Sequence, residues 1–234
     1  MVTTIADLRS DLGKIRSEVI HIAHMDDVFW QIQAVIQSNP AIDRPGIIQD
    51  WIARAYSDSV LAGLRRLGDR RRDNLSLWRV LESMKACTSL ITRVWYVEMH
   101  EAELKRLANE WFDDLIGVGK RNLNSATISE KQKELEAALE SVVNFANENI
   151  THLAAKPTGA IVTFLDVRKA LARAFRVFTW CSRLLDSTVP LSAVPVNLEN
   201  WLKDLRVPWL PEGAPPPSYK HLDEVLREDS ETSV

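Results

Sequence analysis

The stretch SEKQKELEAALESVVNFANENITHL (residues 129–153) carries the most regular apolar pattern in this sequence. Its apolar residues recur every three or four positions, which is the spacing that returns side chains to one face of an α-helix. Ser129 and Gln132 have the spacing of a capping box, so the pattern predicts a helix that starts at this serine. The predicted buried face consists of Leu135, Leu139, Val142, Ala146, Ile150 and Leu153.

The remainder of the chain predicts more helices of the same kind. Glycine and proline are rare inside the long segments, and the alternation typical of strands is almost absent. The fold class expected is all-α, an up-and-down bundle of about six helices that fills residues 1–190. Residues 191–234 are expected to form a short helix and an extended, proline-rich C-terminal arm. The other predicted helices cover residues 5–38, 45–68, 74–87, 88–116 and a segment that includes 164–185.

The composition excludes several classes of protein. A net charge of -3 over 234 residues gives no general attraction for nucleic acid, so any such binding must come from a local basic patch. No apolar run is long enough to span a bilayer and no signal peptide is visible, so we expect a cytoplasmic protein without a membrane partner. The two cysteines, far apart in apolar stretches, are expected to be reduced core thiols.

No cofactor or metal is predicted. The sequence has no glycine-rich phosphate loop and no nucleophile elbow. His21, His24 and Asp27 follow one another by about one helical turn, but no fourth ligand lies at a telling distance. The eight tryptophans mostly occupy apolar helical positions, so we interpret them as core or interface residues and not as platforms for bases.

His152 allows two interpretations. It lies near the end of a predicted helix, beside Asn144, Asn147 and Glu148 on the polar face. A histidine there is suited to proton transfer, because its ordinary pKa is close to neutrality. The same residue in a last helical turn also favours the negative end of the helix dipole and can bond a free carbonyl. Residue chemistry alone leaves both interpretations open.

Two groups of basic residues are candidate phosphate contacts. The run RRLGDRRRD (residues 65–73) concentrates arginines, among them Arg71 and Arg72, at a predicted helix junction. Guanidinium groups match the geometry of phosphate, although aspartates in the run neutralise part of the charge. A second group follows one face of the last predicted helix, where solvated arginines would look the same: Lys169, Arg173, Arg176 and Arg183.

Two segments resemble a bacterial family. The stretch RLGDRRRDNLSLWRVLESM (residues 66–84) is similar to a helix junction with an aspartate, a basic run and a D-x-x-S-L helix start. The stretch ANENITHLAAKP (residues 146–157) is similar to a later helix of the same family that ends in a histidine. The family is the abortive-infection U-type branch of the HEPN superfamily (higher eukaryotes and prokaryotes nucleotide-binding), and the resemblance extends loosely from residue 15 to residue 186.

This resemblance implies a helical bundle, often a homodimer, that acts in phage defence or in a toxin–antitoxin pair. Active HEPN ribonucleases cut RNA without metal through an arginine followed, after four to six residues, by a histidine. The histidine corresponds to His152, but Asn147 stands where the arginine is expected. Asn147, as a second catalytic candidate, and Lys156 are expected to flank the scissile phosphate. A literal match to the motif, Arg16 to His21, is a rival site in the first predicted helix.

The resemblance therefore predicts a metal-independent or degenerate endoribonuclease that binds RNA or a nucleotide, with a defence-system or antitoxin protein as a possible partner. Arg72 or Arg176 would add phosphate contacts. The alternative is a non-enzymatic, dimeric interaction module whose tryptophan-bearing helices bind a partner.

Overall fold

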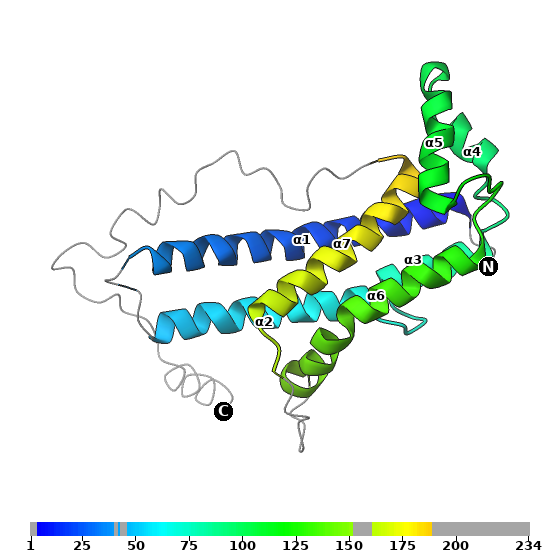
Figure 1. The fold of residues 1–234 in the computed structure, drawn as a ribbon. Coiled ribbons are helices and arrows are strands. Elements are labelled where there is room, and N and C mark those ends of the chain that lie inside the picture. Colours follow the sequence, from blue (N-terminus) through cyan, green and yellow to red (C-terminus); the bar gives the residue numbers. More distant parts are fainter. Residues whose placement is uncertain (1–3, 40–41, 43–45, 152–160, 189–234) are drawn as a thin grey trace, which may run out of the picture. The chain divides into compact units, whose positions relative to one another are not determined.

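The computed structural model describes residues 4–39, 42, 46–151 and 161–188, and they form helices (Figure 1). Within these ranges no strand occurs, which confirms the predicted all-α class. The elements, in chain order, are α1 (Ile5–Gln37), α2 (Ile47–Leu67), α3 (Leu77–Ala86), α4 (Arg93–Glu98), the 3₁₀ turn η1 (Ala102–Leu104), α5 (Lys105–Ile116), α6 (Ser125–Ala146), the π-helical turn η2 (Asn147–Thr151) and α7 (Phe164–Asp186).

The four long helices pack against one another. Helix α1 contacts α2, α3 and α7, and α6 contacts α2, α3 and α7. Consecutive long helices run in opposite directions, α1 against α2 and α6 against α7 (Figure 1). Their apolar faces meet in one continuous core, which includes Leu12, Val19, Leu64, Leu135, Leu139, Val142, Ala174, Phe178 and Leu185. Burial of these side chains is the main stabilising contribution to the bundle.

Helix α6 begins earlier than the sequence pattern predicts. Asn124 is its N-cap, and the side-chain oxygen of Asn124 accepts a hydrogen bond from the Thr127 amide at 2.9 Å. The capping box predicted at Ser129 and Gln132 is therefore wrong. Gln132 is buried, and its amide instead donates to the Glu82 carboxylate of α3 at 2.8 Å.

Two further boundaries differ from the prediction. Helix α3 starts at Leu77 because Ser76 caps it, its hydroxyl accepting from the Arg79 amide at 3.0 Å. The predicted helix 88–116 is divided into α4, η1 and α5, and Thr92 caps the first of these. The predicted short helix and arm of residues 191–234 lie outside the described residues. None of the helices in the described ranges has the length and apolar character needed to cross a membrane.

Candidate functional site

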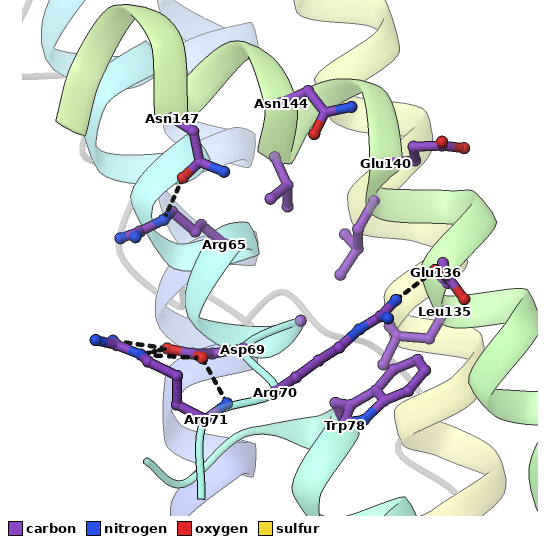
Figure 2. Close-up of a pocket in the computed structure, with 13 residues that line it drawn as sticks. Arg65, Asp69, Arg70, Arg71, Trp78, Leu135, Glu136, Glu140, Asn144 and Asn147 are labelled. Atoms are coloured by element: carbon purple, nitrogen blue, oxygen red, sulfur yellow. Dashed lines mark hydrogen bonds and ion pairs between the residues drawn. The ribbon is translucent and has the colours of Figure 1, made fainter. Parts of the chain in front are cut away.

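A cavity of about 450 Å³ lies between the C-terminal part of α2, the loop that follows it and helix α6 (Figure 2). Its size falls in the usual range of small-molecule sites. We call it the α2–α6 cavity. The residues that line it are Arg65, Gly68, Asp69, Arg70, Arg71, Trp78, Leu135, Glu136, Leu139, Glu140, Val143, Asn144 and Asn147.

Gly68, one of the lining residues, lets α2 approach α6 closely. A Cβ on this residue would lie 2.9 Å from the Leu139 Cδ1 atom, which is closer than carbon atoms ordinarily pack. Gly68 is also the C-cap of α2, and its amide donates to the Leu64 carbonyl at 3.2 Å. Gly68 is therefore both the C-cap of α2 and a point where α2 comes close to Leu139 of α6.

Asp69 organises the loop between α2 and α3. Its carboxylate accepts from Nη2 and Nε of Arg71 at 2.8 and 3.1 Å and from the side-chain Nδ2 of Asn74 at 2.7 Å. The Ser76 hydroxyl donates to the Asp69 carbonyl, which joins the loop to the start of α3. Because the Arg71 guanidinium stabilises the ionised form, the pKa of Asp69 lies well below its ordinary value. Asp69 is therefore a fixed anion at neutral pH and not a proton donor.

Arg70 spans the other side of the cavity. Its guanidinium forms an ion pair with Glu136 of α6 and lies over the Trp78 ring, 4.1 Å from the ring centroid (Figure 2). Cation–π contacts of this kind occur when a guanidinium stacks on an indole face. Trp78 lines the cavity and one face of its ring is covered by the Arg70 guanidinium, although the sequence analysis assigned the tryptophans to core or interface. Trp78 does pack against the core as well, so that interpretation holds in part.

Arg65 is bonded differently from its neighbours. Its Nε donates to the side-chain oxygen of Asn147 at 2.7 Å, across the gap between α2 and η2 (Figure 2). Among the residues that the structure describes, this neutral carboxamide is the partner of Arg65, whereas Arg70 and Arg71 each pair with a carboxylate. The bond brings a cation from α2 to the residue that lies five positions before His152 in the sequence.

The predicted site residues fall into three groups. Asn147 and Arg71 line the α2–α6 cavity. Arg72 is exposed at the adjoining loop and is not among the lining residues. His152 and Lys156, the residues on which the catalytic hypothesis depends, lie outside the described residues. Arg173 and Arg176 are likewise absent from the cavity lining, and both are exposed on α7.

The rival motif in α1 places its two residues in different surroundings. Arg16 forms an ion pair with Asp186 at the end of α7, at 3.3 Å, and the same nitrogen donates to the Thr188 hydroxyl at 3.3 Å. His21 is exposed. In this arrangement Arg16 joins α1 to α7.

Sequence analysis did not single out Arg65, Arg70, Trp78 or Glu136. Both arginines belong to the basic run that was noted, but the run itself does not show which of its members face α6. Glu136 and Leu139 are three residues apart, so their side chains are neighbours on the surface of α6. A charged residue therefore borders the apolar face of this helix. That adjacency was the available signal for a polar cavity along this helix.

No group of three or more potential metal ligands occurs in the part of the chain that the structure describes, and the histidines of α1 do not form one. A comparison of the chain with protein-family models, with curated proteins and with solved structures finds no significant match.

Proposed function

We propose that this protein is a HEPN-type helical protein of bacterial defence that binds RNA in the α2–α6 cavity and cleaves it without metal. The resemblance of residues 66–84 and 146–157 to that family suggests the activity. The hydrogen bond between Arg65 and Asn147 is the observation that carries the proposal. This bond places the Arg65 guanidinium beside Asn147, and Asn147 occupies the position at which active HEPN ribonucleases have an arginine.

Arg65 has the properties of a phosphate ligand. Because Nε is held by Asn147, the orientation of the guanidinium plane is fixed by a contact that does not neutralise it. Its two terminal nitrogens are the donors that match a pair of phosphate oxygens. A fixed positive charge beside the scissile phosphate would stabilise the extra negative charge of the transition state, which an asparagine cannot do.

His152 is the acid–base group in this proposal. RNA cleavage without metal proceeds by attack of a 2′-hydroxyl on the adjacent phosphorus, and the bond from phosphorus to the 5′-oxygen breaks. One imidazole takes the proton of the attacking hydroxyl, and a second, protonated imidazole gives a proton to the leaving oxygen. Two copies of His152 in a homodimer would supply both groups, and Lys156 would lie near the same phosphate.

The test compares purified variants for cleavage of total RNA and for binding of a labelled single-stranded RNA. The variants are His152→Ala, Arg65→Gln and the matched control Arg54→Gln, which removes an exposed arginine from the same helix. We expect His152→Ala to abolish cleavage while binding persists. Arg65→Gln should weaken binding by about 10- to 100-fold, the value of a hydrogen bond to a charged group.

The control variant should bind and cleave RNA as the wild type does. Equal binding by Arg65→Gln and the wild type would remove Arg65 from the site. Cleavage that survives in His152→Ala would remove the histidine, and absence of RNA binding by the wild type would refute the proposal as a whole.

A non-enzymatic dimer is the second candidate, and the first turn of α2 favours it. Ile47, Ile48 and Trp51 are 91%, 58% and 64% exposed, and their spacing places them side by side at that end of the helix. We propose that a second copy of the chain covers this turn. Sedimentation measures the oligomeric state of the wild type and of Trp51→Glu, and we expect a dimeric wild type and a monomeric variant. A monomeric wild type, or a variant that is still a dimer, would contradict the proposal.

A further inference from the structure

The basic residues of α7 form a row that the α2–α6 cavity does not use. Lys169, Arg173, Arg176 and Arg183 follow one another at spacings of four, three and seven residues. An α-helix turns by 100° and rises by 1.5 Å per residue, so the four side chains lie within about 80° of one another around the axis, in a row about 21 Å long. We call this row the α7 basic face.

The described part of the chain leaves the charges of this face unpaired. The ion pairs of α7 use other residues, because Arg168 binds Asp26 and Asp186 binds Arg16 of α1. Among the residues that the structure describes, no carboxylate lies within ion-pair distance of the four cations. The face therefore has a formal charge of +4, in a chain whose net charge is -3.

The spacing of these cations is unfavourable for an isolated helix. Lys169 and Arg173 are four residues apart, and Arg173 and Arg176 are three apart, so each pair is adjacent on the helix surface. Like charges at these spacings destabilise a helix by about 0.2–0.5 kcal/mol per pair. A segment with several negative charges that lies along the face would replace these repulsions with attractions.

The apolar side chains on the same side of α7 favour a polypeptide over RNA. Leu165, one turn before Lys169, is 52% exposed, and the exposed Ala172 lies between Lys169 and Arg176. A phosphate backbone has no apolar groups to cover them, whereas a polypeptide supplies carboxylates and apolar side chains together. A bilayer fits less well, because the apolar side of α7 is already buried in the core of the bundle.

The sequence contains a segment with the complementary chemistry. The stretch HLDEVLREDSETSV (residues 221–234) carries five carboxylates and one arginine, a formal charge of -4. Three apolar residues, Leu222, Val225 and Leu226, stand among these charges. The stretch lies outside the described residues. Its formal charge is equal and opposite to that of the α7 basic face.

We propose that the α7 basic face of one copy of this chain binds residues 221–234 of a second copy. Each copy carries both partners of the contact, so the exchange is reciprocal and gives a closed dimer with two equivalent contacts. The α7 basic face shares no residue with the α2–α6 cavity or with the first turn of α2. The inference therefore does not depend on RNA binding. Because the contact is ionic, it weakens as the salt concentration rises.

Sedimentation of the full chain at several salt concentrations tests this contact. The wild type should be a dimer at low salt and should dissociate as NaCl is raised. The face variant combines Arg173→Glu and Arg176→Glu, and it should raise the dissociation constant of the dimer by about tenfold or more, because two attractions become repulsions. The control combines Arg121→Glu and Lys133→Glu, two exposed cations elsewhere, so the net charge changes equally. It should dimerise as the wild type does.

A charge exchange between the two partners identifies the bound segment. The segment variant combines Glu228→Lys and Asp229→Lys. It should dimerise as weakly as the face variant when each is alone. An equal mixture of the two should form a heterodimer, because in that pair each altered surface meets an opposite charge. Circular dichroism of each variant confirms that it is folded.

Four results would overturn the inference. A monomeric wild type is the first. A dimer that persists in about 1 M NaCl and in the face variant is the second, because the surface charges are then screened and the interface lies elsewhere, as at the first turn of α2. Absence of a heterodimer from the mixture would exclude residues 221–234 of a second copy. Loss of RNA affinity in the face variant, with an unchanged dimer, would assign the face to RNA.

Discussion

Tyr56→Phe should destabilise the bundle through one buried hydrogen bond. The Tyr56 hydroxyl donates to Oδ1 of Asp26 at 2.7 Å, and Asp26 is only 5% exposed. The Trp30 indole donates to the same oxygen at 3.2 Å, and Arg168 lies 3.2 Å from the other oxygen. The substitution keeps the ring stacked on Phe29, at 3.9 Å between centroids, so the loss is confined to the hydroxyl.

A hydrogen bond to a buried ionised group contributes about 1.5–3 kcal/mol to stability. We therefore expect the free energy of unfolding of Tyr56→Phe to fall by about that amount at pH 7. For a chain of this size, about 2–4 °C of melting temperature is lost for each kcal/mol, so the midpoint should fall by about 3–12 °C.

The effect should shrink in acid, and the sign follows from Asp26. Burial raises the pKa of Asp26 above its ordinary value, so the folded state binds the proton more tightly than the unfolded chain does. Ionised Asp26 thus costs stability above its folded pKa, and this cost disappears as the pH falls through that pKa. The Tyr56 hydroxyl offsets part of the cost by bonding the ionised form. Once Asp26 is protonated, the cost of burying its charge is gone, and the loss of the Tyr56 hydroxyl should lower the free energy of unfolding by less.

Urea denaturation of wild type and Tyr56→Phe at a series of pH values from 7 to 4 measures this. Tyr96→Phe is the control, because Tyr96 is also buried but, among the residues described, no carboxylate is bonded to it. Its cost should not depend on pH. A destabilisation by Tyr56→Phe below about 0.5 kcal/mol, or one of constant size across the series, would refute the reasoning.

Two other predictions concern titratable groups. The pKa of Asp69 lies well below its ordinary value because Arg71 binds the ionised carboxylate. Ionised Asp69 therefore stabilises the fold at any pH above the ordinary pKa. This contribution is lost as the pH falls through the pKa of the folded state. Urea denaturation should therefore show a smaller acid loss for Asp69→Asn than for the wild type; equal losses would contradict this. Cys87 and Cys181 are buried, and burial raises the pKa of both, that of Cys181 to about 12. A colourimetric thiol reagent should label neither in the native protein and both in urea, and labelling without urea would show that the thiols are accessible.

The all-α class and the long helices follow from local patterns. Four residues of α6 are buried as their spacing predicts: Leu135, Leu139, Val142 and Ala146. Apolar residues that recur every three or four positions share one face of a helix, and that face packs against the core. The start of α6 did not follow. Several polar residues near residue 124 can cap a helix, and their chemistry is nearly equivalent. In the structure Asn124 caps the helix, and the side-chain nitrogen of Gln132 donates to Glu82 of α3.

The described part of the candidate site depends on contacts between distant segments. Arg65 and Asn147 are 82 positions apart, and they meet because α2 and α6 pack in one particular register. That register depends on details such as the absence of a side chain at Gly68, where Leu139 fills the space. Helical periodicity places a residue on a face but does not say which residue of another helix lies opposite.

The basic run of residues 65–73 illustrates why a count of charges does not identify a phosphate site. Arg66, Arg70 and Arg71 are each paired with a carboxylate, and those carboxylates come from α1, α6 and the run's own loop. Arg65 differs because its partner in the described chain is the neutral amide of Asn147. An incoming phosphate must compete with an existing anion at the first three arginines but not at the fourth. Substitution of Arg65 should therefore weaken RNA binding more than substitution of any one of the three arginines that are paired with a carboxylate. A larger loss of affinity at one of those three would mean that the ion-paired arginines, and not Arg65 with its amide contact, form the binding surface.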